Sequence, residues 1–220
     1  MNGLRERLVL YAVTDRAWLS AVPAERASLE DQVEEAVRGG ATIVQLREKG
    51  LDDAAYAALA RCVKTVTDAL GVPLIVNDSL AVSIASDAAG LHVGQADGSV
   101  RMIRARLGPG KILGVSAQTV AQAHAAEADG ADYLGVGAVF PTATKPDAAE
   151  VPLRELAAIC AAVRIPVVAI GGIHAGNAWV LKGCGLAGIC VVSALFARPG
   201  QVRASARELR ALAEGVIRQA

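Results

Sequence analysis

Short apolar runs alternate with longer amphipathic stretches along nearly the whole chain. Most of the short runs are continuously apolar, as expected for strands that are covered by helices on one face and by a packed interior on the other. They predict eight strands: Leu8–Val13, Thr42–Leu46, Pro73–Val76, Gly90–Val93, Ile112–Val115, Tyr133–Val136, Val167–Ile170 and Gly188–Val192.

The stretches between these strands show helical spacing and recognisable helix ends. Ser28 is placed to cap a helix that ends before Gly39, and Asp52 is placed to cap the next one. Apolar residues repeat at helical spacing after Asp52 until Gly71 stops the pattern. Residues 201–218 predict a last helix.

Eight strand-then-helix units indicate the fold. They leave roughly 27 residues per unit, which is lean but sufficient for a closed barrel. We therefore predict an α/β protein with a single (β/α)8 TIM barrel, formed by residues 1–220 as one catalytic domain. An open doubly wound sheet, which the same alternation also produces, is the alternative.

Composition narrows the classes of partner. Lys plus Arg and Asp plus Glu both number 22, so the chain lacks the basic excess typical of nucleic-acid binders. No segment approaches the ~18 uninterrupted apolar residues of a membrane helix. The four cysteines form no CxxC pair and predict reduced thiols in a cytoplasmic protein. We expect small-molecule substrates, no nucleic acid and no membrane, and leave a homo-oligomer open.

Polar residues follow several of the predicted strands. In a parallel barrel the catalytic groups come from the carboxyl ends of the strands and the loops after them. The stretch 45–49 reads Gln-Leu-Arg-Glu-Lys after the second strand, Asn77 and Asp78 follow the third, and Asp97 follows the fourth. Taken singly, these are also ordinary charged loops or helix caps, and His92 within a strand is more often a satisfied core histidine.

Two of these carboxylates predict a metal site. Asp78 and Asp97 follow adjacent strands, so together they can hold one Mg²⁺ while substrate phosphates complete its coordination shell. With Arg47, Lys49 and Lys145 beside the metal, the positive surplus is about +3, which suits an organic pyrophosphate. This grouping of charges follows from the predicted barrel, which brings the strand ends together.

The later strand ends predict further ligand contacts. Ser116 has no Ser/His/Asp triad around it, so hydrogen bonding is favoured over nucleophilic attack. The long loop 140–146 reads Phe-Pro-Thr-Ala-Thr-Lys-Pro, and loops of this length in a compact barrel are often functional. Gly171-Gly172 and Ser193 follow the seventh and eighth strands, where barrels commonly bind phosphate. Two anion sites are therefore expected.

Together these motifs resemble the thiamine phosphate synthase family, from Tyr11 to Leu195. The most specific parts are residues 45–49, residues 90–97 (Gly-Leu-His-Val-Gly-Gln-Ala-Asp) and residues 140–145, with Asn77-Asp78 between them. The resemblance implies transfer of the aminopyrimidine methyl group from its pyrophosphate ester to the nitrogen of a thiazole phosphate. Thiamine phosphate and pyrophosphate would be the products, and Mg²⁺ the cofactor.

The resemblance also implies a role for each site residue. Asp78 and Asp97 would hold Mg²⁺, and Arg47, Lys49, Ser116 and Lys145 would be catalytic. Further substrate contacts would come from Gln45, Leu46, Arg47, Glu48, Lys49, Asn77, Ser116, Thr142, Ala143, Thr144, Lys145, Gly172, Val192 and Ser193. The chain departs from the family pattern at residues 185–188 and 173–177, which leaves Gly172 and Ser193 in place.

Two other functions are alternatives to this one. A thiazole tautomerase on the same scaffold would use a histidine soon after the fifth strand, where this chain has Gln118, and would need neither Asp97 nor the Thr-x-Thr-Lys loop. A non-catalytic phosphate-binding barrel is disfavoured, because the clustered charges are costly without a metal or an anion to neutralise them.

Overall fold

Eight parallel strands close into a barrel. The computed structural model describes residues 2–21, 28–142, 144, 149–198 and 200–218. The strands follow one another around the barrel in chain order, and the eighth pairs with the first. They are β1 (Leu10–Val13), β2 (Ile43–Leu46), β3 (Leu74–Asn77), β4 (Gly90–Val93), β5 (Ile112–Ala117), β6 (Tyr133–Val136), β7 (Val167–Ile170) and β8 (Gly188–Val191). The predicted barrel is confirmed, and the open doubly wound sheet is wrong.

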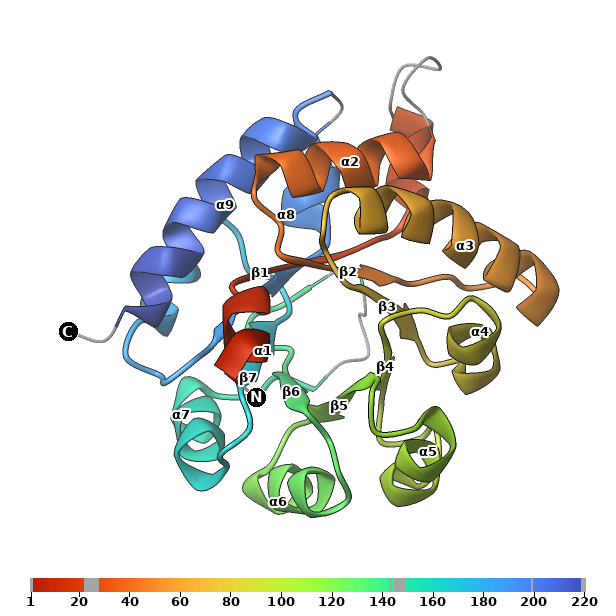
Figure 1. Cartoon of the computed structure of the whole chain (residues 1–220). Coiled ribbons are helices and arrows are strands. Elements are labelled where there is room, and N and C mark those ends of the chain that lie inside the picture. Colours follow the sequence, from red (N-terminus) through yellow and green to blue (C-terminus); the bar gives the residue numbers. More distant parts are fainter. Residues whose placement is uncertain (1, 22–27, 143, 145–148, 199, 219–220) are drawn as a thin grey trace.

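Helices surround this ring of strands (Figure 1). In the described part of the chain they are accompanied by short 3₁₀ helices, η1 (Arg16–Ala21) and η3 (Ala178–Leu181). The α-helices are α1 (Asn2–Arg7), α2 (Leu29–Gly39), α3 (Asp53–Ala69), α4 (Leu80–Ala85), α5 (Val100–Leu107), α6 (Val120–Ala128), α7 (Leu153–Ala162), α8 (Ser193–Phe196) and α9 (Val202–Ile217).

The helix starts follow the predicted caps. The Ser28 hydroxyl accepts a hydrogen bond from the Asp31 N–H at 3.0 Å, and the Asp52 carboxylate accepts one from the Ala55 N–H at 2.8 Å. Such caps satisfy N–H groups that the first turn of a helix leaves without a partner. Helix α5 is capped by Ser99, which leaves Asp97 available for another role.

The core has two layers, as the side-chain alternation along the strands requires. The outer layer lies between strands and helices and includes Leu46, Val76 and Leu134. The inner layer fills the barrel and includes Ile43, Ile75 and Val168, together with two tyrosines described below. Successive residues of one strand therefore belong to different layers, and this decides which side chains can reach a pocket inside the barrel.

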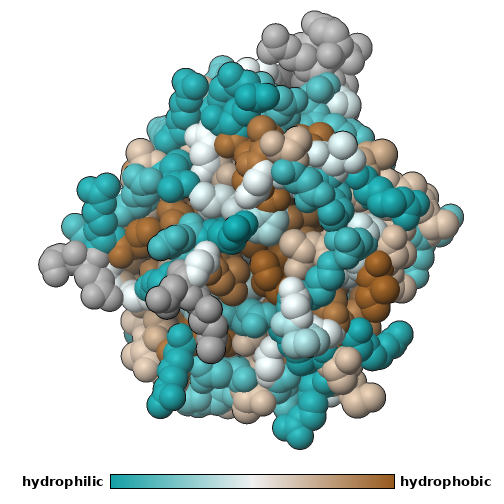
Figure 2. Space-filling view, in the orientation of Figure 1, coloured by the Kyte–Doolittle hydropathy of each residue, from teal (hydrophilic) through white to brown (hydrophobic). Residues whose placement is uncertain are grey.

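Helix α1 covers the amino end of the barrel. The Arg5 guanidinium donates to the Leu186 carbonyl oxygen at 3.2 Å, just before β8 begins, and Leu4 packs against the inner layer. In Figure 1 α1 lies over the ring of strands. The surface seen from the same side is largely polar, with apolar residues exposed between the polar ones (Figure 2). No helix in the described ranges is long and apolar enough to cross a membrane.

Candidate active site

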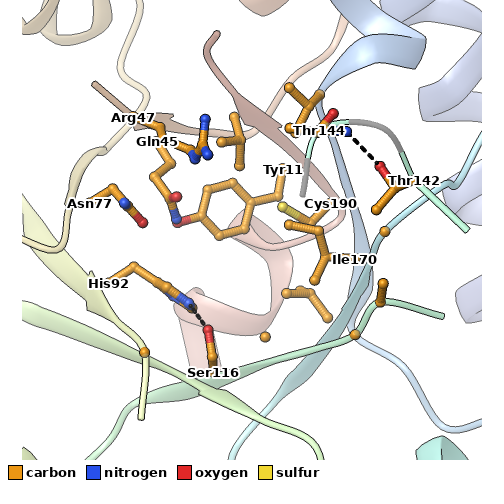
Figure 3. Close-up of a pocket in the computed structure, with 18 of the residues that line it drawn as sticks. Tyr11, Gln45, Arg47, Asn77, His92, Ser116, Thr142, Thr144, Ile170 and Cys190 are labelled. Atoms are coloured by element: carbon orange, nitrogen blue, oxygen red, sulfur yellow. Dashed lines mark hydrogen bonds between the residues drawn. The ribbon is translucent and has the colours of Figure 1, made fainter. Parts of the chain in front are cut away.

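A pocket of about 440 Å³ lies at the carboxyl end of the barrel, within the size range of small-molecule sites. Figure 3 shows side chains from many strands converging on it, with the Tyr11 ring among them. The structure brings together these residues of the predicted site: Gln45, Arg47, Lys49, Asn77, Asp78, Asp97, Ser116, Thr142, Thr144, Gly172, Val192 and Ser193.

Two of the predicted substrate contacts, Leu46 and Glu48, do not line the pocket with their side chains, and two others fall outside the described residues. The Leu46 side chain points the other way and is fully buried in the outer core layer, because it alternates with Gln45 along β2. The Glu48 side chain forms an ion pair with Arg16 of η1 at 2.7 Å and does not line the pocket. Ala143 and Lys145 lie outside the described residues.

The acidic centre consists of Asp78 and Asp97. Their carboxyl groups are close enough to hydrogen-bond each other, and burial followed by the charge of Asp97 raises the pKa of Asp78 to about 6. The Asp97 carboxylate also accepts a hydrogen bond from the Gly94 N–H at 2.6 Å, which fixes the turn after β4. Two carboxylates this close repel each other unless a proton or a cation lies between them. The pair therefore has the chemistry of a cation site.

The backbone of Asp78 is also unusual. Its φ of 64° is in the left-handed region, which Asp and Asn adopt more readily than most residues but still at a cost. The Asp78 N–H donates to the His92 carbonyl oxygen at 2.9 Å, so the strained residue is tied to the end of β4. This conformation keeps the carboxyl groups that follow β3 and β4 at one place on the rim.

Arg47 and Lys49 supply positive charge on the same side. The Arg47 N–H donates to the hydroxyl of the fully buried Thr14 at 3.1 Å. Its guanidinium lies 3.9 Å from the Asp15 carboxylate, a separation at which the cation stays available to a bound anion. Lys49 is exposed at the edge of the pocket. The cations and the acidic centre thus lie around one cavity.

Tyr56 of α3 braces the loops that carry these groups. Its hydroxyl donates to the Leu46 carbonyl oxygen at 2.6 Å and also lies 3.2 Å from the Asn77 carbonyl oxygen. The Asn77 N–H donates back to the same hydroxyl at 3.3 Å. One buried phenol therefore holds the ends of β2 and β3 together.

The loop after β6 lies on the opposite side of the pocket. The Gln118 amide donates to the carbonyl oxygens of Gly137 and Ala149, at 3.2 and 3.3 Å, and so ties together the two ends of this loop. Within it the Thr144 N–H donates to the Thr142 hydroxyl at 3.3 Å (Figure 3). Gln118 therefore has a hydrogen-bond partner at each end of the loop. Both threonines face the pocket.

Gly172 shows how closely this loop approaches β7. Its φ is +61°, and a Cβ atom there would lie 2.4 Å from the Pro141 carbonyl oxygen. Close packing by itself thus requires glycine at this position. The backbone of Gly172 remains part of the pocket wall beside Val192 and Ser193, where the short α8 begins.

Several residues of the pocket are not among the predicted site residues. Tyr11, Gln95 and Cys190 line the cavity, and so does His92, which the sequence favours as a core histidine. Tyr11, His92 and Cys190 are interior strand positions and look like any other buried strand positions, so only the periodicity of the inward-facing residues distinguishes them. Gln95 lies in the turn after β4. His92 is buried and hydrogen-bonded on both ring nitrogens, so it is both satisfied, as expected, and part of the pocket wall.

A closed (β/α)8 barrel with this pocket defines a class of protein, an enzyme that acts on a small molecule at the carboxyl ends of its strands. Within that class, residues 10–195 match the family model described as thiamine monophosphate synthase. The chain belongs to this family and is a transferase.

Individual relatives are similar to this protein over most of its length. Thiamine-phosphate synthase 2 of Streptococcus pneumoniae is 51% identical over 192 residues, covering 87% of this chain and 89% of the relative. Thiamine-phosphate synthase of Ruminiclostridium cellulolyticum is 46% identical, covering 91% and 92%. The solved structure of thiamine phosphate pyrophosphorylase from Pyrococcus furiosus is 35% identical, with a TM-score of 0.86 and coverage of 98% and 100%.

Proposed function

We propose that the pocket transfers the aminopyrimidine methyl group of a pyrophosphate ester to the nitrogen of a thiazole phosphate, giving thiamine phosphate and pyrophosphate. The observation that carries this proposal is the placement of Asp78 and Asp97 on the same pocket wall as Arg47 and Lys49, opposite the threonine loop. Membership of the thiamine monophosphate synthase family supports it. Two anionic substrates would then meet inside one cavity.

Asp78 and Asp97 would hold Mg²⁺. Burial, followed by the charge of Asp97, raises the pKa of Asp78 to about 6, and a pair of carboxylates in this state fits a cation between them. No group of three or more His, Cys, Asp or Glu side chains suited to a metal occurs in the part of the chain that the structure describes. An ion held by two carboxylates keeps positions for phosphate oxygens and water, as Mg²⁺ sites commonly do. When bound, the metal would neutralise charge on the departing pyrophosphate.

The protein's own cations would bind and orient the same leaving group. Arg47 and Lys49 stand on the wall beside the carboxylates, and the family resemblance adds Lys145. The thiazole nitrogen is already a nucleophile, so the reaction needs no general base. Fixed positive charge at the place where negative charge develops is then the main contribution of the protein.

The thiazole phosphate would occupy the other side of the pocket. Thr142, Thr144 and Ser193 supply hydroxyl groups there, and Gly172 leaves its backbone accessible. The resemblance also assigns Val192 and Ala143 to this subsite. Gln45, Asn77 and Ser116 would contact the pyrimidine. Leu46 and Glu48 would contribute only through their backbones, because their side chains lie elsewhere.

A thiazole tautomerase remains the second candidate of the same fold. Its reaction would need a base beside the thiazole, where this chain has Gln118. The Gln118 amide is not a base, and it already donates to two backbone carbonyl oxygens. The transferase reaction needs no base at position 118, so Gln118 favours the transferase over the tautomerase.

The deciding experiment supplies both substrates to the purified protein, with Mg²⁺ or with EDTA. We expect thiamine phosphate and pyrophosphate to form in equal amounts, and EDTA to stop the reaction until Mg²⁺ is restored. Asp97→Ala should lower turnover severely, whereas Asp31→Ala, an exposed aspartate of α2, should not. A folded protein that forms no product under these conditions contradicts the proposal.

We also propose that residues 1–220 act as one catalytic domain in the cytoplasm. The eight strands form one closed barrel, and the pocket draws residues from all of them. A homo-oligomer stays open, and light scattering of the purified protein would decide it.

A further inference from the structure

Five polar side chains form a continuous hydrogen-bonded chain across the barrel interior. The Gln45 amide nitrogen donates to the Tyr11 hydroxyl at 2.9 Å, and the Tyr11 and Tyr133 hydroxyls hydrogen-bond at 2.7 Å. The Tyr133 hydroxyl lies 2.9 Å from His92 Nδ1, and His92 Nε2 lies 3.0 Å from Ser116 Oγ. Figure 3 shows His92 and Ser116 pointing toward each other beside the pocket. The chain therefore begins and ends at residues that face the pocket.

The barrel provides space for these rings. A Cβ atom on Gly114 would lie 2.1 Å from the Tyr133 ring, and one on Gly135 would lie 3.0 Å from the His92 ring. Tyr11 and Tyr133 pack edge to face, with ring centroids 5.8 Å apart. Both tyrosines are at most 1% exposed, so their hydroxyls depend on protein partners for hydrogen bonds. Replacing either partner would leave a buried polar group unsatisfied.

The amide at one end sets the direction of the chain. An amide nitrogen can only donate, so the Tyr11 oxygen accepts from Gln45. The other hydrogen-bond partner of the Tyr11 hydroxyl is Tyr133, so the buried Tyr11 hydrogen is satisfied when it is directed to the Tyr133 oxygen. Tyr133 then directs its hydrogen to His92 Nδ1. A ring nitrogen that accepts a hydrogen bond carries no hydrogen of its own, so Nδ1 is bare and the buried ring carries one hydrogen. That hydrogen is left on Nε2, which donates to Ser116 Oγ.

We propose that Tyr11 and Tyr133 are positioning residues that hold His92 as its Nε2–H tautomer and thereby turn the Ser116 hydroxyl hydrogen toward the pocket, where it meets an acceptor atom of the pyrimidine substrate. Ser116 Oγ accepts from His92, so its own hydrogen is not needed for that bond. The ring nitrogens of an aminopyrimidine are acceptors and complement such a donor. This inference deepens the proposed function and rests on it for the identity of the ligand.

The tautomer can be measured without any substrate. The full-length protein, labelled with ¹⁵N-histidine, gives long-range ¹H–¹⁵N correlations that distinguish a protonated ring nitrogen from a bare one. Replacing the exposed His124 and His174 by Gln leaves only the signal of His92. We expect hydrogen on Nε2 and none on Nδ1. Hydrogen on Nδ1 instead would mean that Gln45 turns its carbonyl toward Tyr11 and that the whole chain runs the other way, which overturns the inference.

Tyrosine-to-phenylalanine variants test the positioning role. Tyr133→Phe removes the donor to Nδ1, and Tyr11→Phe removes the group that orients Tyr133, so in both variants the ring should no longer be held as the Nε2–H tautomer alone. Tyr56→Phe is the matched control, because it also deletes a buried hydroxyl but lies outside the chain. An unchanged His92 tautomer in both test variants removes the tyrosines from this role.

Steady-state kinetics give the second readout. In Tyr133→Phe we expect kcat/KM for the pyrimidine pyrophosphate to fall about fivefold, the size of one neutral hydrogen bond, with the KM for the thiazole phosphate unchanged. If the KM for the thiazole phosphate changed as much as kcat/KM for the pyrimidine pyrophosphate, the substitution would have damaged the whole pocket, which contradicts the inference. If the wild-type protein forms no thiamine phosphate while the tautomer result holds, the proposed function fails and the hydrogen-bonded chain stands.

Discussion

His92 should make the stability of the protein depend on pH in a way that one substitution removes. The ring is buried between Tyr133 and Ser116, and burial lowers its pKa from 6.5 to about 4. In the unfolded chain the same histidine takes up a proton near its ordinary pKa. Between these two values the unfolded state binds more protons than the folded state. The free energy of unfolding therefore falls as the pH drops from about 6.5 toward 4.

The size of this effect follows from the two pKa values. Between about pH 8 and about pH 5 the contribution of His92 should fall by about 2 kcal/mol, and below pH 4 the loss should level off at about 3 kcal/mol. Asp78 acts in the opposite direction, because its raised pKa makes the folded state bind a proton first as the pH falls. A comparison with His92→Gln cancels Asp78, since both proteins contain it.

Equilibrium unfolding in urea at both pH values measures the difference. Fluorescence and circular dichroism should give coincident transitions before a free energy is derived. We expect the wild-type protein to lose about 2 kcal/mol more than His92→Gln between pH 8 and pH 5. Equal pH dependence of the two proteins would show that His92 is not held neutral by burial, and the proposed direction of the hydrogen-bonded chain would lose its support.

Three further changes test other parts of the site. Asp97→Asn should raise the Mg²⁺ concentration for half-maximal activity at least about tenfold, measured by titrating the metal at saturating substrates. Tyr56→Phe should lower the free energy of unfolding by about 1–2 kcal/mol, measured in urea, because its hydroxyl braces the ends of β2 and β3. Gly114→Ala should lower it by about 1–3 kcal/mol and reduce turnover, because the added methyl group would overlap the Tyr133 ring.

The barrel was predictable because its signals are local. Apolar runs gave all eight strands within a few residues, and Ser28 and Asp52 cap the helices that they were predicted to cap. The main difference is at the first strand, which starts at Leu10. The Leu8 N–H instead closes the turn after α1 by donating to the Arg5 carbonyl oxygen. A short helix of six residues such as α1 carries too little periodicity to be predicted.

The rim of the pocket was partly predictable, and its floor was not. Polar residues directly after strands must face the carboxyl end of the barrel, which is why Asp78, Asp97 and Ser116 were found. Glu48 follows the same rule in sequence, but its partner Arg16 comes from another loop, and local charge does not reveal such a pairing. Tyr11 and Tyr133 read as ordinary buried strand residues, because their hydrogen bonds connect strands far apart in the sequence.

The two central tyrosines combine packing with polarity. They are the largest fully buried side chains of the protein as described, in a chain with only 3% aromatic residues. Truncating either would open a large cavity and cost about 3–5 kcal/mol, which would hide any effect of the lost hydroxyl. Phenylalanine keeps the ring and removes only the oxygen. Because packing and hydrogen bonding reside in the same side chains, the Tyr→Phe comparison is the one that separates the stability of this barrel from the orientation of Ser116.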